Sequence, residues 1–440
     1  MTTKLRITRY ALWGPGGLET DTTAHGNEDV SGSTTGNILN SQFSILNSLS
    51  IVFGCGGTGG HIIPALAIAR EFSALGHRIV FIGNRDGMEA SLVKREGYPF
   101  HPIRVQKLSR GGDLSLLRFP FLLIGSSINC FTYYRKLRPN AVVCTGGFVS
   151  GPVAIAAILA RIPLFFHESN SMPGLTTRLL ARFTRITFVS WQAALKRLQN
   201  APVRMSAIPL LPRDGSSIQN VKTETNPAGD KGSASEPVDP HTGLSSLGID
   251  SSQPVILVSG GSQGSLMINR CIDAALDAML ARGWQLIWQT GQSGYQEYSS
   301  RHKGKTGVHI FAFSPQLPLF YQAAAAAVTR AGAMTIAEQE EYRVPAILIP
   351  LPSAAANHQY YNAIGQEQKG VAICLEQKHL GPDSLIAALD RILQNRDAYL
   401  ARLLAIPANT ASRDISAAII SNLSAGPQVP SSSKEQHGAR

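Results

Sequence analysis

The sequence repeats one pattern along most of its length: a short apolar run, a glycine turn and a longer segment with helical periodicity. In the first half, "LSIVFG" precedes "HIIPALAIAREFSALG", and "HRIVFIG", "AVVCTGG" and "PLFFHE" follow. In the second half, "PVILVSGG", "WQLIWQTG", "VHIFAF" and "PAILIPL" alternate with segments such as "LMINRCIDAALDAMLARG". Strands and helices that alternate in this way form a parallel sheet with helices on both faces, joined by right-handed crossovers. The pattern therefore predicts an α/β protein with doubly wound sheets.

The length of 440 residues exceeds what one ordinary hydrophobic core holds, so we expect two domains. Between Pro212 and Gly248 there are almost no large apolar side chains, which is typical of a flexible linker insertion. Residues 1–48 are rich in Thr, Gly, Ser and Asn without periodicity, which indicates a disordered extension or upstream sequence misread as coding. The predicted ranges are an N-terminal domain at 49–212, the linker at 213–248, a C-terminal domain at 249–405, a last helix at 406–424 and a disordered tail at 425–440.

The composition is that of a soluble enzyme, with 44% hydrophobic and 16% charged residues. A net charge of +11 favours an acidic partner, which nucleic acid, an anionic membrane or a phosphorylated substrate would each satisfy. The five cysteines lie far apart, so we expect reduced thiols in a cytoplasmic protein. The N-terminus lacks the order of a signal peptide, and the best apolar stretch, which begins at Leu116, is interrupted by Arg118 and Pro120. No membrane-spanning helix is expected.

The segment "CGGTGGHIIPALAIA" at 55–69 places a histidine at the end of a glycine loop. Glycines allow a sharp turn before a helix, which would explain the loop structurally. Alternatively, backbone N–H groups at the start of the helix would face the oxygens of a ligand. A P-loop is excluded because the loop ends in Gly-Gly-His, and an NAD site is disfavoured because the next strand ends "FIGNRD" without a ribose-binding acid at its tip.

Further polar loops follow strands in the second half. "VSGGSQGS" at 258–265 repeats the glycine turn, and "TRAGAMTIAEQ" at 329–339 offers Arg330 to neutralise phosphate and Glu338 to accept two ribose hydroxyls. Glu338 would otherwise stabilise only the first turn of its own helix. Because the carboxyl ends of parallel strands share one edge of each sheet, these loops are expected to form a ligand site.

Two more segments fit the same edge. "FFHESNSMPG" at 165–174 places His167, Glu168 and Asn170 after a strand, although a lone histidine is more often a structural residue. "ANHQYYNA" at 356–363 follows the strand "PAILIPL", where a surface loop would explain it almost as well. That these polar loops all follow strands at sheet edges is hard to explain as coincidence.

Six segments in order, "GGTGGHIIPALAIA", "GGFVSGP", "HESNSMPGLTTRLLA", "GGSQGS", "TRAGAMTIAE" and "HQYYNA", resemble the bacterial MurG family of glycosyltransferases. The resemblance runs from about Leu49 to Leu423. It implies a GT-B fold of two Rossmann-like domains across a cleft, with a last helix that returns to the first domain. It also implies transfer of N-acetylglucosamine from UDP-N-acetylglucosamine to undecaprenyl-linked lipid I, which gives lipid II for peptidoglycan synthesis, with no cofactor, metal or nucleic acid.

The resemblance also assigns substrate contacts. The residues it implies are Thr58, Gly59, Gly60, Asn170, Ser262, Ser314, Arg330, Ala333, Met334, Thr335, Ile336, Ala337, Glu338 and Gln359, with Glu168 and Arg213 as further candidates. Ser262 would lie at the diphosphate, Ser314 would offer its backbone to uracil, and Gln359 would contact the sugar hydroxyls. Two positions depart from the family. Phe148 replaces a tyrosine, and Leu211 in "AIPLL" replaces an arginine that contacts the donor, whose place Arg213 would have to take.

His61 is the expected catalytic base. An inverting displacement at the anomeric carbon needs a base on the acceptor hydroxyl and charge stabilisation on the departing UDP. A helix N-terminus disfavours protonated imidazole, so His61 would be neutral near pH 7. Alternatively, His61 only holds the loop or the acceptor diphosphate. The sequence contains no Asp-X-Asp, so helix dipoles and Arg330 rather than a metal would stabilise the leaving diphosphate.

The stretch at 108–140 mixes large apolar side chains with arginines and a lysine. It is expected to dock on the anionic cytoplasmic face of the inner membrane, where the protein would be peripheral, unless it is an ordinary buried helix with a basic end. Two other functions stay open. A UDP-N-acetylglucosamine 2-epimerase would need no lipid-facing surface, and a binding-only homologue would bind the donor without transfer.

Overall fold

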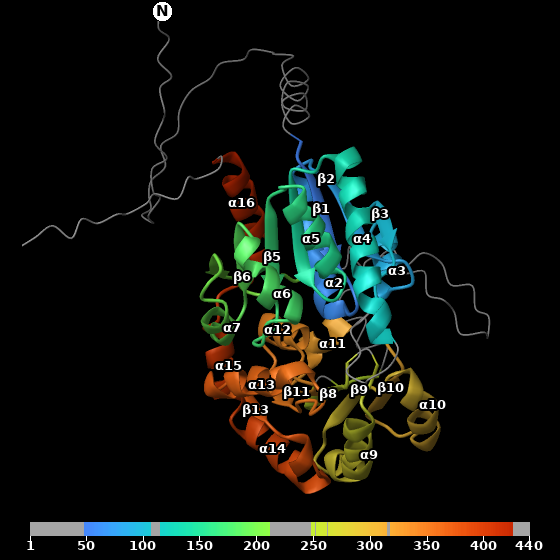
Figure 1. The fold of residues 1–440 in the computed structure, drawn as a ribbon. Coiled ribbons are helices and arrows are strands. Elements are labelled where there is room, and N and C mark those ends of the chain that lie inside the picture. The colour runs from blue at the N-terminus through green and yellow to red at the C-terminus, as the bar shows by residue number, and fades with distance from the viewer. Residues whose placement is uncertain are drawn as a thin grey trace, which may run out of the picture. The chain divides into compact units, whose positions relative to one another are not determined.

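A computed structural model describes residues 48–106, 115–211, 248–250, 252–261, 263–314 and 317–425, without the side chains of 115–118, 318 and 355. The predicted N-terminal extension, the linker insertion and the C-terminal tail fall almost entirely outside these residues. The described residues contain two parallel β-sheets, one from each half of the sequence, and helices flank the strands of each sheet (Figure 1).

The first sheet has seven strands in the order β3-β2-β1-β4-β5-β6-β7, and every neighbouring pair is parallel. Its strands are β1 (Ser50–Cys55), β2 (Arg78–Asn84), β3 (Phe100–Ile103), β4 (Ala141–Gly146), β5 (Leu164–Glu168), β6 (Ile186–Val189) and β7 (Val203–Met205). The strand order reverses between β1 and β4. The ends of β1 and β4 are therefore where a ligand of this sheet is expected.

Alternate residues of the first sheet's strands enter two separate hydrophobic cores, as the two-residue period of a strand requires. Ile51 and Phe53 pack in one core with helices at Gly59–Ala74 (α2), Met88–Arg95 (α3) and Ala411–Ser424 (α16). Val52 packs in the other core with helices at Ser115–Leu137 (α4), Ser150–Leu159 (α5) and Gln192–Arg197 (α7). The helices of this half are α2 (Gly59–Ala74), α3 (Met88–Arg95), α4 (Ser115–Leu137), α5 (Ser150–Leu159), α6 (Leu175–Leu180), η1 (Ala181–Phe183) and α7 (Gln192–Arg197).

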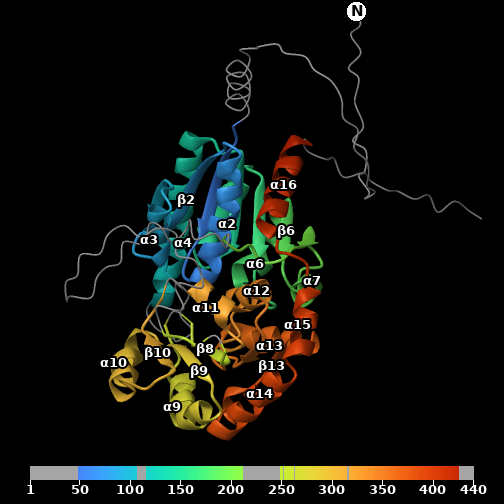
Figure 2. The same ribbon diagram turned by 180° about the vertical axis from the view of Figure 1, so that it is seen from behind.

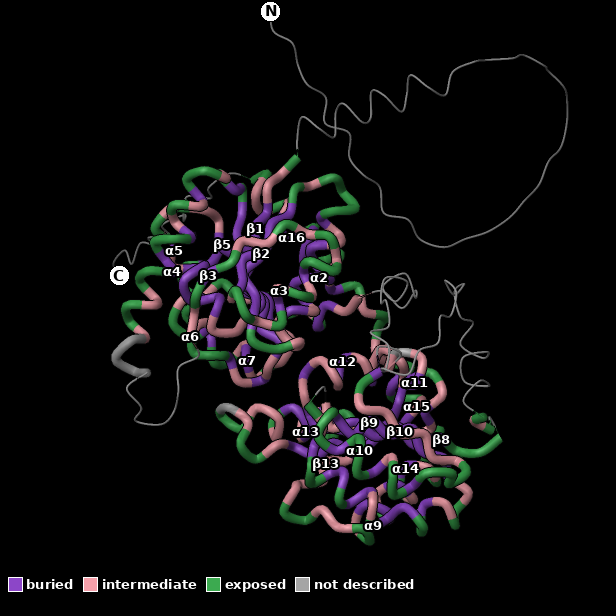
Figure 3. The backbone as a smooth tube through the Cα atoms, turned by 90° about the vertical axis from the view of Figure 1, so that its right-hand side faces the viewer, coloured by how far each residue is buried: buried purple, intermediate pink, exposed green. Residues whose placement is uncertain are grey.

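The second sheet has six parallel strands in the order β10-β9-β8-β11-β12-β13. The strands are β8 (Val255–Ser259), β9 (Gln285–Gln289), β10 (Val308–Phe311), β11 (Ala326–Thr329), β12 (Ala346–Leu348) and β13 (Ala372–Cys374). The helices of this half are α9 (Leu266–Ala281), α10 (Gln292–Arg301), α11 (Leu317–Ala323), α12 (Ala333–Tyr342), η3 (Ala355–Asn357), α13 (His358–Gln368), η4 (Gln377–His379), α14 (Pro382–Gln394) and α15 (Arg396–Leu404). Buried residues run along the strands of both sheets (Figure 3).

The predicted doubly wound α/β architecture is confirmed, with differences in detail. "ANHQYYNA" contributes the first turns of α13 rather than a surface loop. Ala356 and Asn357 take left-handed conformations, with φ of 50° and 55°, directly before this helix begins. An alanine in that region is strained, so the surrounding packing must hold the turn that leads into His358.

The last helix, α16 (Ala411–Ser424), packs against the first half of the chain (Figure 2). Ile415 and Ile419 are fully buried in the same core as Ile62 and Leu66 of α2. The chain therefore crosses between the two halves twice, once before the second sheet and once after it. Within the ranges that the structure describes, no helix is both long and apolar enough to cross a membrane.

Candidate active site

The first glycine loop joins the end of β1 to the start of α2. Gly57 has a φ of 90°, which an L-residue adopts only with strain. Thr58 is the N-cap of α2, but its side chain makes no capping hydrogen bond, and the first turn of the helix contains no acidic residue. The N-terminal N–H groups of α2 are therefore suited to a ligand oxygen.

His61 lies in the first turn of α2 with its ring against the loop that follows β4. Its Nδ1 is 3.3 Å from the carbonyl oxygen of Gly56 and 3.4 Å from Thr58 Oγ1. A carbonyl oxygen only accepts hydrogen bonds, so Nδ1 carries the proton and Nε2 carries the lone pair. A Cβ at Gly146 would lie 2.6 Å from His61 Cδ2, so this glycine leaves the space that the imidazole occupies.

Burial lowers the pKa of His61, while the carboxylate of Glu168 and the hydrogen bond to Gly56 act to raise it. The lowering effect is the larger, so the imidazole is neutral near pH 7. Neighbouring His167 is a different case. It is buried between the hydroxyls of Ser169 and Ser190, and burial lowers its pKa to about 4. That arrangement is typical of a structural histidine.

Glu168 organises the loop after β5. Its buried carboxylate accepts hydrogen bonds from the backbone and side-chain nitrogens of Asn170 at 3.1 and 3.2 Å, and from Gly174 N and Thr177 Oγ1 at 2.9 Å each. Four hydrogen bonds to one carboxylate fix the loop and leave the charge beside His61. This geometry gives Glu168 an orienting role toward Asn170.

The second glycine loop joins β8 to α9, and Ser262 within it lies outside the described residues. Ser265 caps α9 by accepting a hydrogen bond from Ile268 N. The buried guanidinium of Arg330 donates to Ser265 Oγ at 2.7 Å, and to Gln377 Oε1 and the carbonyl oxygens of residues 349 and 350. Arg330 thus holds the second glycine loop to the ends of the neighbouring strands, rather than extending freely toward a phosphate.

The α12 segment brings the predicted donor residues to the first half of the site. The helix begins at Ala333 after Gly332, whose cap makes no side-chain hydrogen bond, and the first turn has no acidic residue. A Cβ at Gly60 would lie 3.8 Å from Met334 Cγ, so the N-termini of α2 and α12 lie close together. Two helix N-termini that meet in this way favour an anionic ligand.

The other residues of the Ala333–Glu338 segment differ in how far their side chains are buried. Ile336 and Ala337 are buried in the second half, Thr335 is half-buried, and burial raises the pKa of Glu338 to about 7. A carboxylate whose charge is this costly to maintain gains more than usual from hydroxyl donors.

Two further loops complete the second half of the site. Ser314 N donates to Gln289 Oε1 at 3.1 Å, and Gln289 Nε2 donates to Ser259 Oγ at 3.2 Å. Gln359, in the first turn of α13, accepts a hydrogen bond from Leu351 N through Oε1 at 3.0 Å. Its amide is therefore oriented so that Nε2 is the end that can donate to a ligand.

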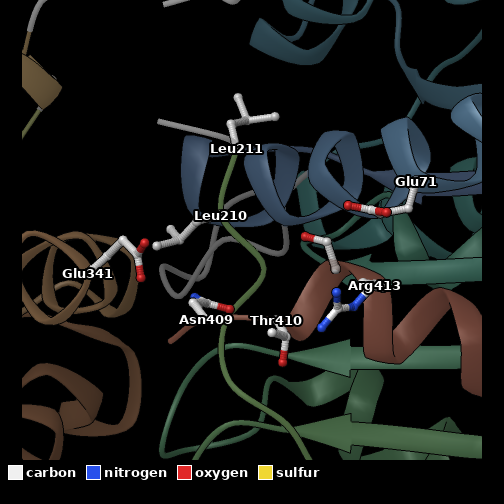
Figure 4. Close-up of a pocket in the computed structure, with 8 residues that line it drawn as sticks. Glu71, Leu210, Leu211, Glu341, Asn409, Thr410 and Arg413 are labelled. Carbon is white, nitrogen blue, oxygen red and sulfur yellow. The ribbon is translucent and has the colours of Figure 1, made fainter. Parts of the chain in front are cut away.

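The structure describes the surroundings of both departures, Phe148 and Leu211. The ring of Phe148 lies against the first glycine loop, 2.9 Å from where a Cβ of Gly57 would be. Leu211 packs on the hydrophobic core of the first half and lines a cavity of about 260 Å³ with Asn409 and Arg413 (Figure 4). An apolar side chain suits that position. Arg213 lies outside the described residues.

The family models match both halves of the chain. The model for the glycosyltransferase family 28 N-terminal domain matches residues 51–189, and the model for the corresponding C-terminal domain matches residues 255–418. The chain belongs to glycosyltransferase family 28. It is therefore a glycosyltransferase, and the GT-B fold expected from the motifs is confirmed.

Among curated family 28 relatives, a protein of Bacillus pumilus is 32% identical over 354 residues, which cover 79% of this chain and 92% of the relative. That protein is named UDP-N-acetylglucosamine–N-acetylmuramyl-(pentapeptide) pyrophosphoryl-undecaprenol N-acetylglucosamine transferase. The crystal structure of MurG from Acinetobacter baumannii is 22% identical with a TM-score of 0.63, covering 85% of this chain and 99% of the other. A putative UDP-N-acetylglucosamine 2-epimerase from Listeria monocytogenes shares the fold at 14% identity and a TM-score of 0.57, covering 86% and 98%.

Sequence reasoning missed three buried polar residues of this family 28 site. Glu89 accepts hydrogen bonds from Gly57 N of the first glycine loop and from Asn84 N at the end of β2, and Gln289 joins the second loop to Ser314. Asn362 of α13 accepts a hydrogen bond from Ser171 N and donates to the carbonyl oxygen of Ala331, so it ties the two halves together. Gln289 is a polar residue at the end of an apolar strand, and Asn362 lies in the polar segment "ANHQYYNA", so both carry a local signal, whereas Glu89 carries none.

Proposed function

We propose that this family 28 enzyme transfers N-acetylglucosamine from UDP-N-acetylglucosamine to the 4-hydroxyl of the muramoyl sugar in undecaprenyl-linked lipid I. The product would be lipid II, the precursor of peptidoglycan. The names of relatives at about a third identity along most of the chain support these substrates. The observation in the site that carries the proposal is the orientation of His61, whose Nε2 lone pair is available because Nδ1 faces the carbonyl of Gly56.

The residues of the site fit a single inverting displacement. His61 Nε2 removes the proton of the acceptor hydroxyl as its oxygen attacks the anomeric carbon of the α-linked donor, and the bond to the UDP oxygen breaks. The N-termini of α2 and α12 stabilise the negative charge that develops on the diphosphate. The proton stays on His61 until the products leave, so each turnover begins with neutral imidazole.

The donor contacts divide between the two halves. Glu338 accepts the ribose hydroxyls, the Nε2 group of Gln359 donates to a sugar hydroxyl, and Asn170 contacts the sugar from the first half. The backbone of Ser314 lies near the uracil, and Thr58 to Gly60 contact the donor across the site. Arg330 supports the diphosphate indirectly, because its donors hold the loop that begins at Gly260.

The outer face of α4 supports a peripheral position on the cytoplasmic face of the membrane. Phe121, Ile124 and Ile128 are 78%, 58% and 58% exposed, and their spacing of three and four residues puts them on one side of the helix. Arg135 and Lys136 are exposed near the end of the same helix. Apolar side chains beside cations suit an anionic lipid surface, where the acceptor's lipid chain would remain embedded.

The test is transfer of labelled N-acetylglucosamine from UDP-N-acetylglucosamine to a lipid I analogue by the full chain. A β-linked disaccharide product that depends on the acceptor supports the proposal. Release of free N-acetylmannosamine without acceptor would indicate an epimerase instead. Binding of UDP-N-acetylglucosamine without either product would indicate a binding-only homologue and would overturn the proposal.

A further inference from the structure

Glu89 is a fully buried carboxylate next to the first glycine loop. It lies in the first turn of α3, with Oε1 accepting a hydrogen bond from Asn84 N at 2.8 Å and Oε2 accepting one from Gly57 N at 3.3 Å. No Lys, Arg or His side chain forms an ion pair with it among the described residues. A buried carboxylate without a cation is costly, so the two N–H donors must stabilise it.

Three glycines make the space for this side chain. A Cβ at Gly56 would lie 2.5 Å from Glu89 Oε1, a Cβ at Gly83 would lie 2.6 Å from its Cγ, and a Cβ at Gly87 would lie 2.4 Å from the carboxylate. These glycines come from three segments: Gly56 directly follows β1, Gly83 lies in β2, and Gly87 directly precedes α3. The backbone is therefore shaped around the carboxylate, which indicates a specific role for it.

One peptide group separates the carboxylate from the histidine. The peptide that links Gly56 to Gly57 donates its N–H to Glu89 and accepts the Nδ1–H of His61 on its carbonyl oxygen, at 3.3 Å in both cases. A trans peptide points its N–H and C=O in opposite directions, so the two partners lie on opposite sides of it. Hydrogen bonding at the N–H polarises the carbonyl, which becomes a stronger acceptor.

We propose that Glu89 is a positioning residue for His61, acting through the Gly56–Gly57 peptide in the way that a carboxylate in direct contact orients the histidine of an acid–histidine pair. The carboxylate fixes the peptide, the peptide fixes the Nδ1–H tautomer, and Nε2 is left as the base. When His61 accepts the acceptor's proton, the polarised carbonyl and the nearby negative charge stabilise the imidazolium. This inference depends on the proposed role of His61 as the base.

Other charged and titratable groups also face His61. Glu168 at the end of β5 acts to raise its pKa more than Glu89 does, and His358 at the start of α13 acts to lower it. His167 of β5 interacts with it as well. Since Glu168 is present in every variant discussed below, removing the charge of Glu89 alone leaves His61 with one carboxylate and lowers its pKa.

The first test compares Glu89→Gln with Glu96→Gln, because Glu96 is a partly buried carboxylate that follows the same helix and pairs with Arg70 at 2.5 Å. Glu89→Gln should reduce kcat about tenfold with the KM for UDP-N-acetylglucosamine little changed, since the lost interaction is made in the transition state. As the pH is decreased, kcat/KM of Glu89→Gln should begin to fall at a lower pH than kcat/KM of the wild type. Glu96→Gln should leave that pH dependence in place. An unchanged pH dependence in folded Glu89→Gln would overturn the proposal.

A double variant shows whether Glu89 affects activity through His61 or independently of it. If Glu89 acts through His61, adding Glu89→Gln to His61→Ala should cost little further activity, whereas independent roles would multiply the two losses. Wild-type transfer activity is measured alongside. If the wild type transfers sugar and the losses of the two single variants multiply in the double variant, the role of Glu89 is disproved but the proposed function is not. If the wild type transfers no sugar, the proposed function itself is disproved.

If Glu89→Gln does not fold, nitrogen NMR of the selectively labelled wild type decides. The proposal requires His61 to be protonated on Nδ1 when neutral, and the Gly57 amide signal to follow the titration of His61. A neutral His61 protonated on Nε2, or a Gly57 amide that does not respond, would contradict it.

Discussion

The two glycine loops occupy equivalent places in the two halves but are held by opposite charges. The first loop is anchored by the buried carboxylate of Glu89, which accepts from Gly57 N, and its helix has no side-chain cap. The second is anchored by the buried guanidinium of Arg330, which donates to Ser265, the side-chain cap of α9. Each anchor has the charge that its side of the proposed reaction would need. In the proposed reaction, a carboxylate would support a base that becomes a cation, and a guanidinium would support the loop at the leaving diphosphate.

The largest expected effect is at the first loop. His61→Ala should lower kcat by roughly a hundredfold to ten-thousandfold, the usual contribution of a general base, while UDP binds as in the wild type. Stopped assays of transfer and calorimetry of UDP binding measure the two quantities. If the variant loses UDP affinity but keeps its turnover, His61 contacts the donor. Both glycine loops would then serve the donor, and the difference between them would disappear.

Arg330→Lys tests the anchor of the second loop. A lysine cannot serve the four oxygen acceptors that the guanidinium reaches, so the free energy of unfolding should fall by about 2–4 kcal/mol. UDP affinity should fall as well, because the loop after β8 loses its support. Urea denaturation is the measurement, with Arg282→Lys on the exposed end of α9 as the control. A variant as stable as the wild type would show that the loop does not depend on the four hydrogen bonds of the guanidinium.

The pH dependence of UDP binding tests the role of Glu338 in the second half. To accept two ribose hydroxyls its carboxyl must be ionised, and burial raises its pKa to about 7. UDP affinity should therefore weaken as pH falls through about 7, and Glu338→Gln should abolish most of this dependence. The variant should bind UDP about tenfold to a hundredfold more weakly at pH 8, since hydrogen bonds to a charged group contribute about 1.5–3 kcal/mol. Calorimetry at several pH values measures the affinity for UDP. If the affinity of Glu338→Gln equals that of the wild type, Glu338 does not contact the ribose.

The smallest effect is expected at the outer face of the first half. Phe121→Ser should weaken binding to vesicles with anionic lipid about fivefold to thirtyfold, because one partly inserted phenyl ring contributes about 1–2 kcal/mol. Leu404→Ser provides the matched control, since this leucine of α15 in the second half is 68% exposed. Cosedimentation at low salt measures both. Equal losses in the two variants would mean that the halves do not differ in membrane contact.

Features that depend on neighbouring residues could be predicted from the sequence, whereas contacts between distant residues could not. The loop at 55–61 and the strand–helix alternation were predictable because each depends on neighbouring residues and a fixed period. Glu89 could not be recognised, since "MEASLVKREG" has the charges of an exposed helix and the glycines around its carboxylate lie at three separate positions. Arg330 was assigned to phosphate on residue type alone. Its four protein acceptors come from segments up to 65 residues away, which a motif cannot show.

The position of α16 affects how the chain can be synthesised. Ile415 and Ile419 complete the core beneath α2, yet they are among the last described residues to leave the ribosome. Until then the first half has an uncovered apolar face that includes Ile62 and Leu66, and such faces invite aggregation or chaperone binding. A message truncated after the first sheet would therefore yield a product that is prone to degradation rather than a stable first half. Because a segment that follows the second half completes the core of the first half, the first half should persist only when translation has passed α16.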